Sequence, residues 1–180
     1  MKQEIQTLDT LRHDCAMKQK KGLHFIMASV MIWAAILMVH LTSLPIETKN
    51  LLTFCCACPL MPLAFLIPKM IHVDFQGKDN PLTKLGLLFS VNQILYILIA
   101  MWVFGAVPEK MLMVYSMIFG AHLMPYSWLY QSRSYMVLSV AIPIAALIVG
   151  LVAEPWVLAA MLLCVEILFS ASLMREVKKL

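Results

Sequence analysis

The stretch Met111–Tyr135 has the sequence MLMVYSMIFGAHLMPYSWLYQSRSY. It is hydrophobic over most of its length, but it carries a histidine, a proline and several aromatic residues where lipid would favour leucine. A helix needs about 20 residues to cross the hydrocarbon core of a bilayer. The stretch therefore predicts one membrane-spanning helix followed by a short turn, and the sequence on both sides of it repeats the pattern.

The composition also indicates a membrane protein. Of the 180 residues, 62% are hydrophobic and only 13% are charged, whereas a soluble domain is about half apolar and about a quarter charged. About six crossings use up the chain, so a soluble domain of ordinary size does not fit beside them.

The pattern of apolar runs predicts an all-α polytopic helical bundle with an N-terminal segment and a short tail. Residues 1–22 are expected to form an amphipathic helix on the cytoplasmic membrane surface, with a solvated helical tail as the alternative. Residues 175–180 form a basic cytoplasmic tail. The predicted transmembrane helices cover residues 23–44, 51–71, 82–105, 110–130, 135–153 and 155–174.

The distribution of charge predicts the orientation. Twelve of the fourteen lysines and arginines fall in segments on one side of the predicted bundle, and only Lys49 and Lys110 fall on the other side. Basic residues favour the cytoplasmic side, so both termini are expected in the cytoplasm. The three short turns on the opposite side carry Glu47, Glu109 and Glu154.

Several polar side chains fall near the predicted midplane. Glu166 lies eleven residues after Pro155, and His122 lies eleven residues after Met111. Both residues are on inward-running spans, so both are about 16 Å deep. Polar groups at such depth usually face the interior of a bundle. The predicted ligand- or ion-binding layer consists of Glu166, His122, Asn92, Gln93, Tyr96 and Tyr126.

The sharpest hypothesis for this layer is a titrating pair of Glu166 and His122. Such a pair would bind a proton, a cation or the amine of a small solute, because a buried carboxylate needs a cationic or hydrogen-bonding partner. The alternative is a structural Glu–His or Glu–Tyr hydrogen bond that sets the register of two helices. The sequence leaves both open.

The cysteines do not predict a metal site. Cys55, Cys56 and Cys58 are close in sequence, and thiolates bind soft metals. A metal site needs about four ligands, however, and only His40 lies at a similar depth. We therefore predict no metal and no cofactor, and interpret the cysteines as small hydrophobic residues.

The function predicted from these features is a small proton- or ion-linked transporter or channel-like protein, expected to be a homodimer. Its partners would be the bilayer and a small solute, proton or ion. The alternative is a non-catalytic binding or regulatory membrane subunit that holds a lipid or other hydrophobic ligand against the aromatic face of the span 110–130. No phosphate loop, nucleophile elbow or zinc-protease motif is found, so we do not predict an enzyme. The net charge of +4 follows from the membrane topology and predicts no nucleic-acid partner.

The segment 122–135, HLMPYSWLYQSRSY, resembles a recurring element in a family of small six-span bacterial integral membrane proteins of uncharacterised function. The pairs Asp14-Cys15 and Lys21-Gly22 are similar to that family as well. The resemblance implies an all-helical fold in a bacterial cytoplasmic membrane. It implies no activity and no site.

Overall fold

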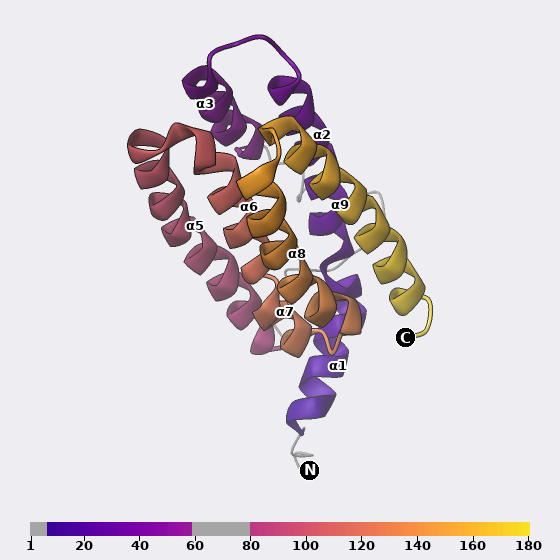
Figure 1. The fold of residues 1–180 in the computed structure, drawn as a ribbon. Coiled ribbons are helices and arrows are strands. Elements are labelled where there is room, and N and C mark those ends of the chain that lie inside the picture. The colour runs from indigo at the N-terminus through magenta and orange to yellow at the C-terminus, as the bar shows by residue number, and fades with distance from the viewer. Residues whose placement is uncertain (1–6, 59–79) are drawn as a thin grey trace, which may run out of the picture.

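The computed structural model describes residues 7–58 and 80–180, and every regular element in these residues is a helix (Figure 1). The α-helices are α1 (Leu8–Lys18), α2 (Leu23–His40), α3 (Ile46–Ala57), α5 (Leu82–Ala106), α6 (Met111–Ala121), α7 (Met124–Leu129), α8 (Arg133–Val152) and α9 (Pro155–Val177). Two short 3₁₀ helices precede α2 and α6, namely η1 (Lys20–Gly22) and η2 (Pro108–Lys110).

In the part of the chain that the structure describes, four segments are long and apolar enough to cross a membrane, which indicates an integral membrane protein. They coincide with the first, third, fifth and sixth predicted spans, within a few residues at each end. The four segments are Lys20–His40, Leu82–Ala106, Arg133–Val152 and Pro155–Val177.

One of the other two predicted spans is interrupted, and the structure describes only part of the other. The predicted span 110–130 is broken at His122 and Leu123, between α6 and α7. Pro125 explains the break, because it has no amide hydrogen to donate to the carbonyl of Ala121. The predicted span 51–71 begins within α3, and its proline-rich remainder lies outside the described residues.

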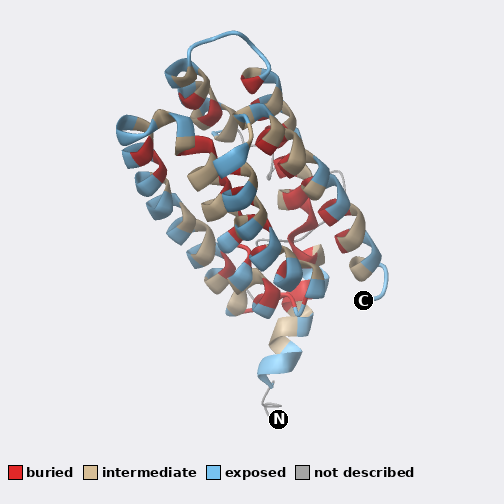
Figure 2. Ribbon diagram, viewed as in Figure 1, coloured by how far each residue is buried: buried red, intermediate tan, exposed pale blue. Residues whose placement is uncertain are grey.

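The helices pack as two close pairs, α2 with α9 and α6 with α8, and the contacts of α9 with α8 and α6 join the two pairs. The core residues lie on the faces that these helices turn toward one another (Figure 2). α5 lies at the edge and packs on α6 and α7. Most of its large apolar side chains are exposed, including Leu98 and Trp102.

Glycine permits the close contact between α6 and α8. A Cβ atom on Gly120 would lie only 2.6 Å from side-chain atoms of Ile142 and Pro143, and one on Gly150 only 2.4 Å from Met113 Cγ. The two helices can approach this closely because each supplies a residue without a side chain, as small residues do in membrane helix pairs. α8 continues through Pro143 without interruption.

α1 and the end of α9 lie at one end of the molecule, here called the terminal end (Figure 1). The connections from α2 to α3, from α5 to η2 and from α8 to α9 lie at the opposite end, here called the turn end (Figure 1).

Hydrogen bonds join α1 and η1 to the segment after α6 at the terminal end. The Arg12 guanidinium donates to the carbonyl of Trp128 at 2.6 and 2.9 Å and stacks over its ring at 4.5 Å. Tyr130 donates to Gln19 Oε1 at 2.7 Å, and Tyr135 donates to the carbonyl of Lys21 at 3.0 Å. The chain segments 12–22 and 128–135 thus form one polar junction.

Candidate binding cavity

A cavity of about 330 Å³ lies among α2, α5, α6 and α7, with the end of α3 at its border. Its wall is largely apolar, and its aromatic members are Phe25, Trp33, Tyr115, Phe119, Tyr126, Tyr130 and Tyr135.

Trp33 anchors the wall on the α2 side. Its side chain is 1% exposed, and its ring meets the edge of Phe119 at 5.6 Å between centroids, with an interplanar angle of 72°. The ring of Tyr115 lies 6.1 Å from that of Trp33 between centroids. Edge-to-face contacts of this kind fix aromatic rings in place, so this part of the wall is preorganised.

Tyr126 anchors the opposite wall. Its hydroxyl donates to the carbonyl of Gly86 at 3.1 Å and lies 2.7 Å from Ser90 Oγ. Its ring packs on the edge of Phe89 at 5.7 Å. The hydroxyl of Tyr126 is therefore bound to the backbone of α5, and its apolar ring forms part of the cavity wall.

His122 lies at the break between α6 and α7. Its Nδ1 donates to the carbonyl of Phe119, since a carbonyl oxygen can only accept. The ring packs against Tyr126 at 6.1 Å between centroids. In the neutral imidazole this arrangement leaves Nε2 as an acceptor at the cavity wall.

Glu166 is fully buried on α9 and contacts Ser29 of α2. The Ser29 hydroxyl lies within hydrogen-bond distance of Glu166 Oε2 and is 2.8 Å from the carbonyl of Ile26. A hydroxyl has one hydrogen, and the Ile26 carbonyl can only accept. Both bonds form together only when the carboxyl of Glu166 carries a proton and donates it to Ser29.

Further polar atoms beside Glu166 lack partners. Glu166 Oε1 and Ser170 Oγ are buried and have no hydrogen-bond partner among the described residues. Buried polar atoms are nearly always paired, so these two mark a place where a proton, a water molecule or a ligand atom would be stabilised. Because Ser29 lines the cavity, Glu166 is one side chain behind its wall.

The structure brings three of the six predicted layer residues to the cavity and places three elsewhere. Gln93, His122 and Tyr126 line the cavity. Glu166 reaches it through Ser29; its hydrogen bond goes to that residue and not to His122.

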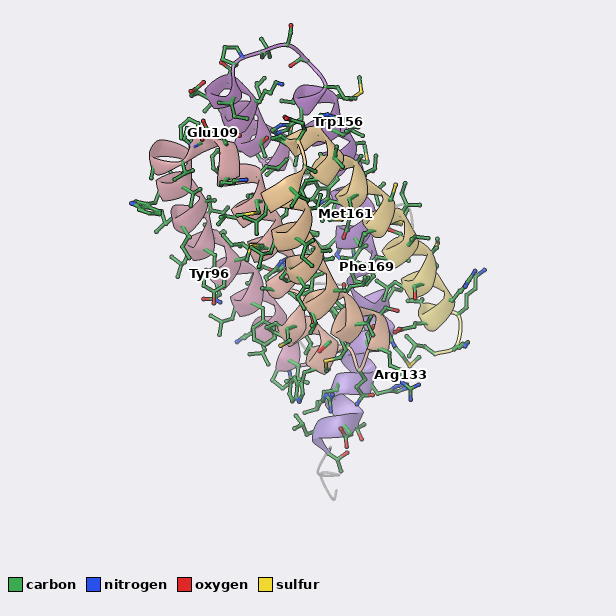
Figure 3. All side chains as sticks on the ribbon, in the orientation of Figure 1. Tyr96, Glu109, Arg133, Trp156, Met161 and Phe169 are labelled. Carbon is green, nitrogen blue, oxygen red and sulfur yellow. The ribbon has the colours of Figure 1, made fainter. Side chains whose placement is uncertain are left out.

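Asn92 and Tyr96 lie on the exposed side of α5. Their side chains bond to each other at 2.9 Å, with Asn92 Nδ2 donating to the Tyr96 hydroxyl. Figure 3 shows Tyr96 at the outer edge of the bundle, pointing away from the other helices. The expected interior layer is therefore split between the cavity and the exterior of α5.

Several cavity residues were not singled out from the sequence, and Ser29 and Trp33 of α2 are among them. These two lie four residues apart and both line the cavity. Ser29 is the single hydroxyl within an otherwise apolar stretch of that helix, which is the signal that could have identified it. Trp33 gives no such signal, because tryptophan is common in apolar spans.

Among residues 7–58 and 80–180, no group of three or more histidine, cysteine or acidic side chains lies close enough to hold a metal ion. Cys55 and Cys58 are exposed near the end of α3, and Cys56 is half-buried. Cys58 borders the cavity.

The comparison with known protein families gives one match. Residues 8–176 match a family model described as "Family of unknown function (DUF7010)". No curated protein and no solved structure shows a significant match. The matched range includes all the helices described above except the last residue of α9, so the chain belongs to this family of unknown function, DUF7010.

Proposed function

We propose that the protein is a non-catalytic membrane protein that binds a hydrophobic molecule, such as a lipid acyl chain, in the aromatic cavity. The observation that carries this proposal is the cavity itself. Its volume of about 330 Å³ falls at the lower end of the roughly 300–1,000 Å³ typical of small-molecule sites.

The character of the wall favours an apolar ligand. Trp33, Phe119 and Tyr115 form a rigid apolar surface on one side, and Tyr126 has its hydroxyl engaged by α5 on the other. Few free polar atoms remain to bind a hydrated ion. Apolar contact with a few oriented polar groups is the usual composition of a site for a lipid-like molecule.

Photocrosslinking tests this proposal. A palmitic acid with a diazirine in mid-chain is added to the protein in nanodiscs, and the irradiated protein is analysed by peptide mass spectrometry. The Trp33 peptide should be labelled, although this side chain is closed off from surrounding lipid. The exposed Trp102 serves as the internal control and should be labelled in every variant.

A cavity-filling variant makes the test specific. Ala57→Phe places a large side chain at the border of the cavity and should abolish labelling at Trp33. Ala106→Phe, on the exposed end of α5, should leave that labelling unchanged. Equal labelling at Trp33 in wild type and Ala57→Phe would reject the cavity as the binding site.

A second candidate function is proton-linked transport, and the contact between Glu166 and Ser29 favours it. A carboxyl that can hold or lose a proton lies directly behind a hydroxyl on the cavity wall. Loss of that proton would free the Ser29 hydroxyl hydrogen from Ile26, because an ionised carboxylate can only accept. The polarity of the wall would then depend on the protonation of Glu166.

Glu166→Gln tests this second function, because glutamine retains a donor and an acceptor but does not titrate. If binding of the palmitate probe varies with pH in wild type and not in this variant, the carboxyl is coupled to the cavity. The same pH dependence in both proteins would assign Glu166 a purely structural role.

We further propose six membrane crossings, to two of which α3 and the pair α6–α7 contribute. The basic residues gathered at the terminal end favour a cytoplasmic location for both termini, in a bacterial cytoplasmic membrane. Cysteine accessibility to a membrane-impermeant maleimide in intact cells tests the orientation. A cysteine introduced at Ser43 should react and one at Lys179 should not, in a variant that lacks the native cysteines.

The exposed polar pair on α5 supports a homodimer as the working assembly. Asn92 and Tyr96 are polar groups on a helix face that otherwise meets lipid. Interhelical polar contacts of this kind contribute about 0.6–2 kcal/mol. Asn92→Leu should therefore weaken self-association, measured by energy transfer between labelled chains in vesicles.

A further inference from the structure

A second cavity, of about 510 Å³, lies at the turn end of the bundle and differs from the aromatic cavity in its chemistry. It lies between the α2–α3 connection, the start of α6 and the α8–α9 connection. Its charged members are Lys49, Lys110, Glu109 and Glu154. We call it the turn-end chamber.

The two lysines are held at the wall by backbone carbonyls. Lys49 donates to the carbonyl of His40 at 3.3 Å, and Lys110 donates to that of Gly150 at 2.8 Å. An ammonium group has three donors, so each lysine keeps donors for another acceptor. Neither lysine forms an ion pair with another described residue.

Asn50 fixes α3 against η2 and so holds the two lysines on the same chamber. Its Nδ2 donates to the carbonyl of Pro108 at 2.8 Å. Asn50 follows Lys49 directly, and Pro108 lies two residues before Lys110. The lysine positions are thus set by a buried contact and not by flexible loops.

His40 supplies an unused acceptor. The Thr53 hydroxyl donates its one hydrogen to the carbonyl of Lys49 at 2.9 Å, so it can only accept from His40 Nε2, which lies 3.1 Å away. In the neutral ring, Nδ1 is then a bare lone pair. The residue is 3% exposed, and Nδ1 has no partner among the described residues.

The chamber therefore offers donors for an anion and acceptors for a cation. Lys49 and Lys110 supply the donors, while Glu109, Glu154 and His40 supply the acceptors. A molecule with a phosphate at one end and a primary ammonium at the other satisfies both sets. Charge-assisted hydrogen bonds to phosphate are among the strongest that side chains make.

The rim of the chamber favours a lipid as the source of that molecule. Val152 is 83% exposed and Trp156 is 45% exposed, and both border the chamber. Figure 3 shows Glu109 and Trp156 at the same end of the bundle. Tryptophan at a helix end commonly marks the head-group level of a bilayer, so a head group in the chamber would have its acyl chains against an apolar rim.

We propose that the turn-end chamber binds a zwitterionic phosphate–ammonium head group, with Lys49 and Lys110 on the phosphate and Glu109, Glu154 and His40 on the ammonium. This site is separate from the aromatic cavity. The proposal therefore holds or fails independently of the function proposed for that cavity.

Native mass spectrometry of the full chain, released from detergent with defined lipids, tests the proposal. The probes are phosphatidylethanolamine, phosphatidylglycerol and glycerophosphoethanolamine. Phosphatidylethanolamine should bind more tightly than phosphatidylglycerol, which has the phosphate without the ammonium. If the soluble glycerophosphoethanolamine competes at equal concentration, the natural ligand of the chamber is a free solute with this phosphate–ammonium chemistry. If it does not compete, the ligand is the lipid.

Two paired variants separate the halves of the site. Lys49→Gln/Lys110→Gln should weaken binding of both lipids by about tenfold or more, and Lys178→Gln/Lys179→Gln at the terminal end is the matched control. Glu109→Gln/Glu154→Gln should remove only the preference for the ethanolamine lipid. Wild-type affinity in the lysine variant would overturn the proposal, and an unchanged preference in the glutamate variant would overturn the ammonium half.

Discussion

Lys21 Nζ lies 2.9 Å from Glu176 Oε2 and thereby joins the start of the first long helix to the end of the last. The carboxylate also accepts from the backbone nitrogen of Ser134 at 2.9 Å and from its hydroxyl at 2.6 Å. Lys21 adopts a left-handed backbone conformation, with φ of 51°. Side chains rarely tolerate that conformation, so the ion pair helps to hold η1 in a strained shape.

The first prediction concerns this ion pair. Glu176→Gln should lower the free energy of unfolding by about 2 kcal/mol, because it leaves the ammonium of Lys21 buried without a counter-charge. Thermal unfolding in detergent measures the loss. The double variant Lys21→Met/Glu176→Gln should recover part of it, and a double variant less stable than the sum of the single changes would contradict the assignment.

The second prediction concerns the contact between α6 and α8. Gly120→Ala should destabilise the protein by about 1–3 kcal/mol, because the new methyl group would overlap the stiff side chains of Ile142 and Pro143. Gly150→Ala should also destabilise it, because the new methyl group would lie 2.4 Å from Met113 Cγ and 2.7 Å from Met113 Cβ, atoms that are close to the backbone of α6. Thermal unfolding compares the variants.

Gly105→Ala is the matched control for these substitutions. A Cβ atom at Gly105 would meet nothing within 4 Å. Alanine favours helix more than glycine does, so this variant should be as stable as wild type or slightly more so. Equal losses at Gly105 and Gly120 would show that close packing is not the cause.

The third prediction concerns Cys15, which is 1% exposed. Burial, with a smaller contribution from the neighbouring Asp14, raises the pKa of the thiol from its ordinary value of 9.0 to about 11. At pH 8 the reactive thiolate should be about 100-fold scarcer than in an unperturbed thiol. N-ethylmaleimide should therefore modify a cysteine introduced at the exposed Ser43 long before Cys15, as peptide mass spectrometry would measure.

The fourth prediction concerns the acid side of the stability profile. A hydrogen bond from Asn80 Nδ2 to Asp14 Oδ2, 2.9 Å long, is the largest cause that lowers the pKa of this carboxyl below its ordinary 3.8. A carboxyl whose pKa is lowered in the folded state stabilises the protein at pH values above its ordinary pKa. That stabilisation is lost as the pH falls through the pKa of the folded state. Thermal unfolding between pH 2.5 and 6 should show this loss.

Asn80→Ala should move the loss to higher pH, because the remaining ion pair with Lys18 is largely exposed to solvent. Asp14→Asn should remove this part of the pH dependence. An identical acid profile in wild type and Asp14→Asn would contradict the role of the hydrogen bond.

The sequence was sufficient to predict an all-helical membrane protein, because the cost of unpaired backbone groups in lipid permits few other structures for such apolar runs. The spans 23–44, 82–105, 135–153 and 155–174 are matched closely by long helices. The break at His122 was not predicted as an interruption. Pro125 signalled it, but proline in a membrane helix is compatible with a gentle bend as well as a break.

The rotation of each helix about its axis was harder to predict. Phe89, Gln93 and Asn92 lie on adjoining parts of α5, yet Phe89 packs inside, Gln93 lines the cavity and Asn92 is exposed. In water an apolar stripe identifies the buried face of a helix. In lipid both faces are apolar, so the pattern that orients soluble helices is absent from α5.

The partners of the buried polar residues were also beyond sequence reasoning. Glu166 was predicted to lie in an interior polar layer. The residue that it contacts is a serine 137 positions away on α2, which the sequence did not indicate. Counting residues from the start of each span gives their depth along the membrane normal. It does not give their positions around the bundle. His122 and Glu166 share a level by that arithmetic, while their hydrogen bonds go to different helices.

Fluorescence quenching of Trp33 tests most directly whether the aromatic cavity holds a hydrophobic ligand. In a variant with Trp102, Trp128 and Trp156 replaced by phenylalanine, Trp33 is the one remaining tryptophan. A dibrominated fatty acid titrated into nanodiscs should quench it saturably, and Ala57→Phe should abolish that quenching. If quenching of Trp33 is absent, or rises in proportion to the brominated lipid without saturating, the cavity does not bind such a ligand.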